Sequence, residues 1–256
     1  MSSNQNITPL SGVRPLSPWD NNKDPRQDFH SFWYLNHTFR VLEHLASLNM
    51  DLRNKKVLEV SAGIGDFTTF FLDRGCTVHA TDSRAPNIAM MKWRFEKEPR
   101  VKTFFLDMEY PGTSDLPRGE KYDVVFNYGL LYHLANPKES IEFLVPFAKD
   151  LFMLETCVSP GTDEAINLVK EEKAYFSQAM HGTGCRPTRP WIFNQLKRHF
   201  PHVYMPKTQP NWKNHPIDWE NKSAWSDLTR AVFVASHRPL DNPLLVPEVP
   251  MQQTRH

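Results

Sequence analysis

Between residues 56 and 158 the chain alternates short apolar runs with amphipathic segments, and this alternation constrains its fold more than any other feature. The apolar runs are short and rich in Val, Leu and Phe, which is typical of strands that are buried on both faces. The segments between them favour helices. We predict strands over residues 57–60, 76–82, 101–107, 122–129 and 150–158. Strands that alternate with helices in this way predict a parallel, doubly wound α/β sheet.

The regions that flank this core are less regular. Residues 1–28 are rich in Ser, Asn, Pro and Asp, which favours an irregular N-terminal arm. Apolar residues at helical spacing then predict a helix over residues 30–50, which we expect to cover the site as an N-terminal lid. Two final strands are predicted over residues 202–206 and 230–237.

An insertion separates the fifth strand from these last two. It covers about residues 159–200, and we expect helices over 164–176 and 191–199 within it. Residues 239–256 contain several prolines and are expected to form a flexible tail. We therefore expect a single domain over residues 29–238, with the insertion as a cap.

Charge and cysteine content exclude several classes of protein. The chain has 30 Lys and Arg against 29 Asp and Glu, so its net charge of +1 indicates no chain-wide electrostatic attraction to nucleic acid. The three cysteines lie far apart without a CxxC pair, which is typical of a reducing compartment and predicts no metal site. No apolar run reaches the roughly 20 residues of a membrane span, and no signal peptide is recognisable. We expect a cytoplasmic protein with no membrane partner.

The turn after the first predicted strand carries a ligand-binding pattern. Glu59 is followed by Ser61, Gly63 and Gly65 between a strand and a helix. Glycines at such a turn allow a ligand to approach backbone N–H groups closely. Taken alone, this short pattern also fits an ordinary strand-to-helix turn.

Polar residues at the ends of the next three strands extend this pattern. Asp82 ends the second strand, where a carboxylate can accept hydrogen bonds from both hydroxyls of a ribose. Asp107 ends the third strand, where it can accept from an adenine amino group, and Asn127 ends the fourth. Because open parallel sheets bind ligands where the strand order reverses, these residues predict a nucleoside site.

Two nucleoside cofactors compete for this site. A dinucleotide fingerprint requires G-x-G-x-x-G, but Thr68 occupies the third glycine position counted from Gly63. Asp66 also places a negative charge where a pyrophosphate has to lie. S-adenosylmethionine has no phosphate and carries a sulfonium and an ammonium cation, so Glu59 and Asp66 are compatible with it. Charge therefore favours the methyl donor.

The ordered motifs VLEVSAGIGDFTTFFLDRG, VHATDSR, FFLDME and YDVVFNYGLLYHL resemble those of class I S-adenosylmethionine-dependent methyltransferases. The resemblance covers roughly residues 55–158. It implies a Rossmann-like, seven-stranded, mostly parallel sheet whose last strand is antiparallel. The family often has glycine where this chain has Ser61. By matching position, the resemblance implies that the cofactor contacts Glu59, Ser61, Gly63, Gly65, Asp82, Ser83, Asp107, Met108 and Asn127.

A narrower segment, GLLYHLANPKESIEFL followed by FMLETCV, is similar to the tRNA wobble-uridine carboxymethyltransferase group and its small-molecule-modifying relatives. We do not extend the RNA substrate to this chain. It lacks the long N-terminal extension of that group, and its net charge is close to zero.

His133 is the predicted catalytic residue. It follows the fourth strand, above the expected methyl position, and a histidine that titrates near neutral pH can remove a proton from an acceptor. The alternative is a histidine that hydrogen-bonds a loop or shapes the cofactor pocket.

Substrate contacts are predicted outside the cofactor motifs. Two arginines in the stiff stretch CRPTRP are spaced to form a fork for an anionic group, and the aromatic N-terminal helix is placed to close over the site. Each also has a plain structural interpretation, as a helix-entrance loop and as core packing. Trp212 and His215 are weaker candidates. The predicted substrate-binding residues are Tyr34, His37, Tyr132, Arg186, Arg189 and Trp219.

Together these features predict a methyltransferase that acts on an oxygen or nitrogen of a small polar or anionic metabolite, with S-adenosyl-L-methionine as cofactor. Two alternatives remain open: an RNA (tRNA) methyltransferase or related RNA-modifying enzyme, and a non-catalytic S-adenosylmethionine-binding module. The sequence leaves the oligomeric state open.

Overall fold

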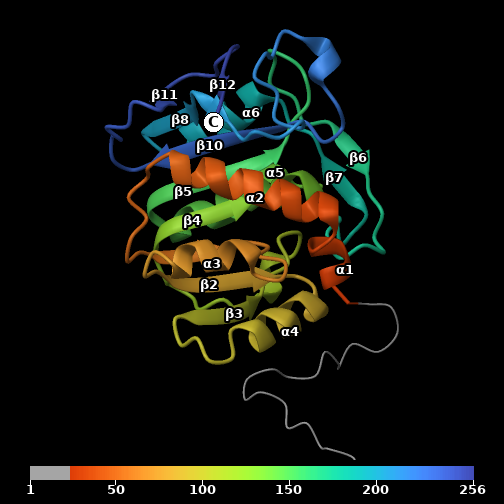
Figure 1. The fold of residues 1–256 in the computed structure, drawn as a ribbon, viewed down its shortest axis with the longest axis vertical. Coiled ribbons are helices and arrows are strands. Elements are labelled where there is room, and N and C mark those ends of the chain that lie inside the picture. Colours follow the sequence, from red (N-terminus) through yellow and green to blue (C-terminus); the bar gives the residue numbers. More distant parts are fainter. Residues whose placement is uncertain (1–23) are drawn as a thin grey trace, which may run out of the picture.

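The computed structural model describes residues 24–256 and contains a central eight-stranded sheet (Figure 1). The strand order is β11-β8-β10-β5-β4-β1-β2-β3. These strands are β1 (Lys56–Glu59), β2 (Thr77–Asp82), β3 (Val101–Phe105), β4 (Tyr122–Tyr128), β5 (Ala148–Cys157), β8 (His202–Pro206), β10 (Arg230–Ser236) and β11 (Leu245–Val246). Most of the predicted N-terminal arm, residues 1–23, lies outside the described residues.

The strand directions confirm the α/β sheet and its antiparallel strand. Strands β1 to β5 run parallel, whereas β10 pairs antiparallel with both β5 and β8. The sheet has one strand more than predicted, because the two-residue strand β11 pairs with the edge of β8. The chain reverses its lateral direction between β1 and β4, so the carboxyl ends of these two strands border a crevice.

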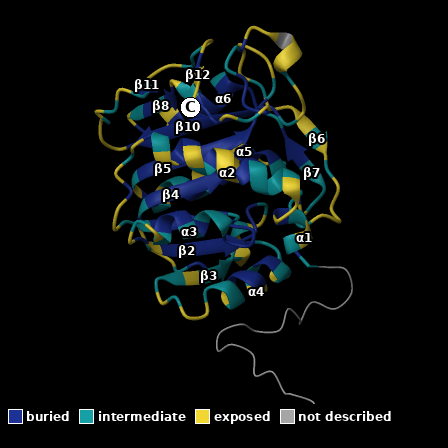
Figure 2. Cartoon of the chain, viewed as in Figure 1, coloured by how far each residue is buried: buried dark blue, intermediate teal, exposed yellow. Residues whose placement is uncertain are grey.

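Helices cover both faces of the sheet. Apolar side chains of α2, α3 and α4, among them Val41 and Phe71, join one buried core on the first face. Those of α5 and α6, including Ile141 and Ile192, join a second core on the other face. The helices are α1 (Arg26–Phe29), α2 (Phe32–Ser47), α3 (Asp66–Leu72), α4 (Ala85–Arg94), α5 (Pro137–Leu144) and α6 (Arg189–Lys197), with the short 3-10 helices η1 (Pro111–Thr113), η2 (Leu131–His133), η3 (Val145–Phe147) and η4 (Lys222–Ala224). Figure 2 shows that the inner strands β2, β4, β5 and β10 are mostly buried, whereas the edge strand β3 is intermediate or exposed.

The insertion differs from the prediction. Residues 164–176 form no helix: β6 (Leu168–Lys170) pairs antiparallel with β7 (Thr183–Cys185). The apolar side chains of this segment do not form the buried face that an amphipathic helix requires, since Ile166, Leu168 and Tyr175 are all exposed. The second expected helix is present as α6, which Thr188 caps by accepting a hydrogen bond from Trp191 N.

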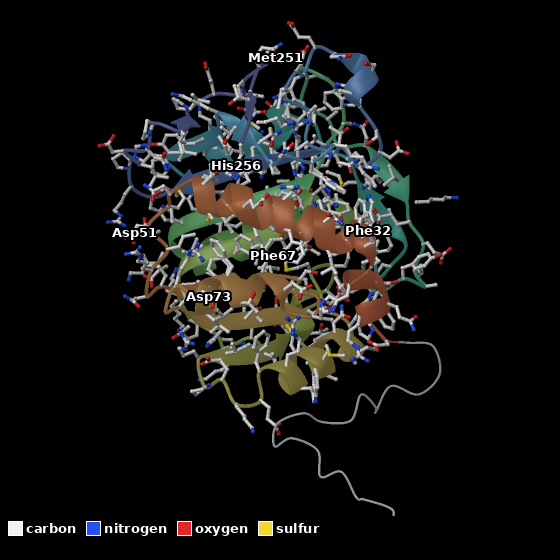
Figure 3. The ribbon with its side chains drawn as sticks, in the orientation of Figure 1. Phe32, Asp51, Phe67, Asp73, Met251 and His256 are labelled. Carbon is white, nitrogen blue, oxygen red and sulfur yellow. The ribbon has the colours of Figure 1, made fainter. Side chains whose placement is uncertain are left out.

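The C-terminal segment, which we expected to be flexible, is bound to the domain. Besides β11 it contributes β12 (Thr254–Arg255), which pairs with β9 (Thr208–Gln209). The His256 ring lies 6.1 Å from the ring of His44, so the C-terminus reaches the surface of α2 (Figure 3). Within the part of the chain that the structure describes, no helix has the length and apolar character needed to cross a bilayer.

Candidate functional site

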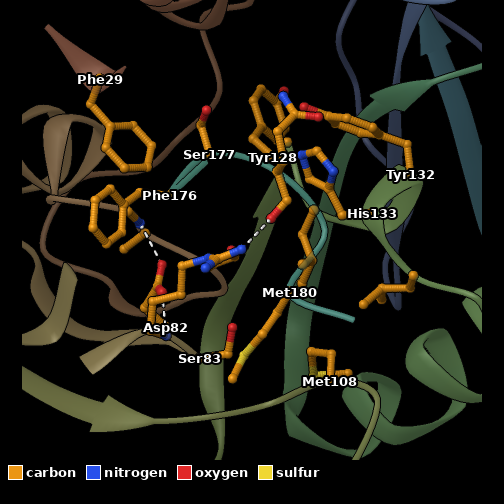
Figure 4. A pocket seen from close by; sticks show the side chains of 18 of the residues that line it. Phe29, Asp82, Ser83, Met108, Tyr128, Tyr132, His133, Phe176, Ser177 and Met180 are labelled. Atoms are coloured by element: carbon orange, nitrogen blue, oxygen red, sulfur yellow. Dashed lines mark hydrogen bonds between the residues drawn. The ribbon is translucent and has the colours of Figure 1, made fainter. Parts of the chain in front are cut away.

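A pocket lies at the carboxyl end of the sheet, and its wall has two parts (Figure 4). We call the first the strand-end half, because it consists of the turns that follow strands β1 to β4. It comprises residues 61–63, 66–67 at the start of α3, 82–84, 106–109 and 128–130. The second, the capping half, comes from α1 and α2, from the 3-10 helix η2 that follows β4, from the insertion, and from strands β5 and β10. It comprises Phe29, Tyr34, His37, Thr38, Tyr132, His133, Leu134, Glu155, Phe176, Ser177, Gln178, Met180, His181 and Arg230.

Asp82 organises the strand-end half. Its Oδ2 accepts a hydrogen bond from Gly63 N at 3.0 Å, and its Oδ1 accepts from Arg84 N at 2.8 Å and from Asn87 Nδ2 at 3.1 Å. Only 3% of the residue is exposed, and burial raises the pKa of the carboxyl to about 6 against these hydrogen bonds. The carboxylate thus joins the β1 and β2 turns and lines the pocket.

The glycine turn has a left-handed backbone. Ser61 has φ of 56° and Gly63 has φ of 58°, and the position of Ser61 is unfavourable for a residue with a side chain. A Cβ at Gly63 would lie 2.7 Å from the ring of Phe29, so a side chain there would displace that ring. Gly65 also has a positive φ, but it starts α3 and is not part of the pocket wall.

Glu59 and Asn127 lie behind the pocket wall instead of on it. Glu59 accepts a hydrogen bond from the Thr68 hydroxyl at 2.6 Å, and burial raises its pKa to about 8. The side chain is therefore neutral at pH 7, and it does not supply the negative charge that the sequence analysis used to favour a cationic cofactor. The amide of Asn127 is fully buried, and neither of its polar atoms has a protein partner.

Asp107, Met108 and Ser83 line the strand-end half as expected from their positions. Asp107 Oδ2 lies 2.8 Å from His181 Nε2, and its Oδ1 accepts from Glu109 N at 3.0 Å. His181 belongs to the insertion, so this pair connects the two halves of the pocket. The sequence analysis did not single out His181.

His133 lines the capping half, next to the end of β4. Its Nδ1 pairs with Glu171 Oε2, and the two side chains are 9% and 4% exposed. Burial lowers the pKa of His133, and the ion-pairing of Glu171 opposes this shift without cancelling it. The imidazole is consequently neutral at pH 7. Arg186 contacts the other oxygen of Glu171 at 3.2 Å.

Three predicted substrate residues lie away from the pocket. Arg186 donates to the backbone oxygens of Tyr132, Cys185 and Asp227, which anchors the insertion to the core. Arg189 donates to Pro250 O at 2.6 Å and lies over the Trp219 ring at 3.7 Å. Trp219 in turn donates to Gln253 Oε1 at 2.6 Å. Arg189 and Trp219 thus attach the C-terminal segment. The other three predicted substrate residues, Tyr34, His37 and Tyr132, do line the pocket.

A buried charged network was missed by the sequence analysis. Arg230 NH1 donates to both carboxylate oxygens of Glu155, at 3.1 and 3.0 Å, and its NH2 donates to the Tyr132 hydroxyl at 2.7 Å. His215 Nε2 lies 3.2 Å from Glu155 Oε1. The available signal was an ionisable residue at the end of each of two otherwise apolar strands, Glu155 in FMLETCV and Arg230 in RAVFVAS.

Residues 58–150 match the family model described as "Methyltransferase domain". This match covers β1 to the start of β5 and identifies a methyltransferase domain there, in agreement with the resemblance to class I S-adenosylmethionine-dependent methyltransferases. The sheet order and the pocket at the β1 and β4 ends agree with this assignment.

Solved structures of other proteins share the fold. The N-terminal domain of EvdMO1, crystallised with S-adenosylhomocysteine and D-fucose, is 16% identical with a TM-score of 0.55, over 91% of each chain. The 1,6-didemethyltoxoflavin-N1-methyltransferase of Burkholderia thailandensis is 19% identical with a TM-score of 0.53, over 82% of each chain. The magnesium protoporphyrin IX methyltransferase of Synechocystis PCC 6803 is 14% identical with a TM-score of 0.53, over 84% of this chain and 90% of that one.

A curated relative is the tRNA U34 carboxymethyltransferase of Vibrio atlanticus (strain LGP32). It is 26% identical over 160 residues, which is 60% of this chain and 46% of the relative. The chain therefore spans about half the length of this relative.

Proposed function

We propose that this enzyme transfers the methyl group of S-adenosylmethionine to an oxygen or nitrogen of a small polar metabolite bound in the capping half. The observation that carries the proposal is His133, which lines the pocket beside the turns that would hold the donor and whose Nδ1 pairs with the buried Glu171 behind it. When bound, S-adenosylmethionine supplies a methyl group activated by its sulfonium.

The strand-end half fits the donor. Asp82 presents a buried carboxylate to the pocket where it would accept from the ribose hydroxyls, and Asp107 with Met108 would flank the adenine. The unpartnered amide of Asn127 is buried at the neighbouring strand end, where it would support the methionine portion. Gly63, whose N–H donates to Asp82, lines the pocket in the turn after β1.

His133 is the base in this proposal. Glu171 accepts a hydrogen bond from Nδ1–H, which selects the tautomer whose Nε2 carries a lone pair. Because burial keeps the imidazole neutral, it can take the acceptor proton as the new bond to the methyl carbon forms. The surrounding residues of α1, α2 and the insertion enclose the site and exclude water.

The acceptor in this proposal is polar but need not be anionic. The guanidinium of Arg230 is already compensated by Glu155, and the Arg186 and Arg189 fork lies elsewhere. Phe29 and Tyr34 add aromatic surface to the wall, which suits a small molecule with a flat or apolar face.

Labelled donor identifies the acceptor directly. The protein is incubated with isotopically labelled S-adenosylmethionine and with separate small-metabolite and tRNA fractions of the native cell, and the products are analysed by mass spectrometry. We expect label in the small-metabolite fraction. Label in tRNA alone would replace this acceptor class with RNA, as the relatedness to the tRNA-modifying enzyme suggests. Bound donor with no labelled product in either fraction would favour a non-catalytic binding module.

A further inference from the structure

Three side chains at the back of the capping half converge from different parts of the chain. His37 comes from α2, Glu155 from the end of β5, and His215 from the segment between β9 and η4. One ligand atom of each, an imidazole nitrogen or a carboxylate oxygen, lies within 4.8 Å of the other two. Among residues 24–256 this is the one group of histidine, cysteine and acidic side chains with such spacing.

The three side chains are buried and not fully hydrogen-bonded. His37, Glu155 and His215 are 7%, 1% and 0% exposed, and neither His37 Nε2 nor His215 Nδ1 has a protein partner. Buried polar atoms in native proteins nearly always have a partner, so the orphaned Nε2 of His37, a residue of the pocket wall, points to an absent ligand. His37 and Glu155 also line the pocket, whereas His215 lies behind them.

We propose that His37, Glu155 and His215 bind one divalent transition-metal ion, such as Zn²⁺ or Co²⁺, in the wall of the acceptor site. Two imidazoles and one carboxylate are a donor set that these ions prefer, and three protein ligands leave coordination positions open toward the pocket. In a tetrahedral site with bonds of about 2.1 Å, ligand atoms lie about 3.4 Å apart. The three ligand atoms, which lie within 4.8 Å of one another, would have to approach by up to about 1.4 Å to close the site.

Arg230 has two effects on the proposed site: its charge repels the ion, and its hydrogen bonds orient the Glu155 ligand. Its guanidinium hydrogen-bonds both oxygens of Glu155, and His215 Nε2 also contacts Oε1, so Oε2 is the oxygen that retains a lone pair for the ion. The positive charge of Arg230 weakens binding of a dication through Coulomb repulsion. The same contact orients the carboxylate as an outer-shell partner does in known metal sites.

The ion would have a role in acceptor recognition. An open coordination position at the pocket wall selects an acceptor with a hydroxyl, carbonyl or amine that can coordinate the metal, and it fixes the orientation of that acceptor relative to His133. This role rests on the proposed function, whereas ion binding itself does not.

Cobalt binding to the untagged, full-length protein tests the site without the donor. The protein is first treated with chelator and dialysed, and Co²⁺ is then titrated while visible absorbance is recorded. We expect saturation at one equivalent with a visible ligand-field band, and displacement of the band by Zn²⁺. Glu155→Gln and His215→Ala should each weaken Co²⁺ binding at least tenfold. The control His202→Ala changes a histidine of β8 outside the cluster and should bind Co²⁺ as the unaltered protein does.

Arg230→Met is the most discriminating variant, because the loss of a buried charged side chain would ordinarily weaken binding at a neighbouring site. Removal of the competing cation should instead tighten Co²⁺ binding. Donor affinity, measured by calorimetry on every variant, shows whether each one is folded and tests the proposed function independently. Absence of a saturable equivalent in the unaltered protein, or unchanged binding in both His215→Ala and Glu155→Gln, overturns the metal site even when the donor still binds.

Discussion

The two halves of the pocket are built from different kinds of chain segment. The strand-end half follows β1 to β4 in sequence order, and each turn contributes a short run of residues to one edge of one sheet. The capping half combines residues from α1 and α2, the insertion and β10, which are up to about 200 positions apart in the chain. A repeated architecture therefore builds the proposed donor site, whereas long-range packing builds the proposed acceptor site.

The halves also differ in how their charges are compensated. Two backbone N–H groups and one side-chain amide donate hydrogen bonds to Asp82. Among the hydrogen bonds described for residues 24–256, none joins the Asp82 carboxylate to a positively charged side-chain group. Glu155 and Glu171 instead pair with arginine and histidine side chains from distant segments. Substitutions in the first half should change donor binding, and substitutions in the second should change turnover or stability.

The largest expected effect is on turnover. His133→Gln keeps a polar side chain but removes the base, so we expect kcat to fall by roughly 10²–10⁴. Donor affinity should stay within about twofold. Steady-state kinetics with the identified acceptor and calorimetry with the donor provide the two measurements.

Glu171→Gln tests how much the orientation of the His133 imidazole contributes, because it leaves the base itself in place. It leaves the imidazole in place and should lower kcat less, by about 10–100-fold. The pH dependence of kcat should shift as well, since Glu171, Arg186 and Arg230 are the charged groups that act on the pKa of His133. If both variants turn over at the normal rate, His133 only shapes the pocket.

Donor binding should respond most strongly to Asp82. Asp82→Ala removes the proposed ribose acceptor and a buried partner of Gly63 N, which should weaken donor affinity by about 10–100-fold. Asp241→Ala, an exposed carboxylate, is the matched control and should have no effect. Equal donor affinity in the two variants would remove Asp82 from the site.

Much of the strand-end half was predictable because the strand-end motifs are local. Each motif follows a buried strand by a few residues, and parallel strands bring their carboxyl ends together without further information. The depth of Glu59 and Asn127 behind the wall was not predictable, since it depends on how α3 packs over the turn. The neutral state of Glu59 follows from that burial.

The capping half was harder to predict because its residues meet only after long-range packing. The spacing of Arg186 and Arg189 in the sequence fits an anion-binding fork. In the structure their N–H groups instead donate to backbone carbonyls, those of Arg189 to the C-terminal segment. Arg230 and Glu155 were overlooked because each is one polar residue at the end of an apolar strand. Only the pairing of β5 with β10 places them together.

Acid should weaken donor binding through the same carboxylate. The raised pKa of Asp82, about 6, means that the side chain is ionised at pH 7.5 and mostly protonated at pH 5. Because the ionised form accepts from the ribose, donor affinity should fall about tenfold between these values. Calorimetry across this range should show the loss in the unaltered protein and a flatter profile in Asp82→Asn.

Arg186 distinguishes an acceptor contact from a structural one. Arg186→Met should lower the free energy of unfolding by about 1–3 kcal/mol, because it removes hydrogen bonds to Glu171 and to three carbonyls. The KM for the acceptor should change little. A large rise in KM at unchanged thermal stability would return this arginine to the acceptor site.

The smallest effect is expected at Ser61. Ser61→Gly relieves the left-handed strain but increases the entropy of the unfolded chain, so a net gain of about 0.5 kcal/mol in unfolding free energy is expected. Donor affinity should be retained. A chemical-denaturation midpoint that falls would indicate that the Ser61 side chain stabilises the turn.

A crystal structure with S-adenosylhomocysteine tests the division of the pocket most directly. We predict that the ribose lies against Asp82, that the adenine lies beside Asp107 and Met108, and that the sulfur points toward the capping half near His133. Density for the ligand elsewhere, or for its adenine among Tyr34, His37 and Arg230, would contradict the assignment of the strand-end half to the donor.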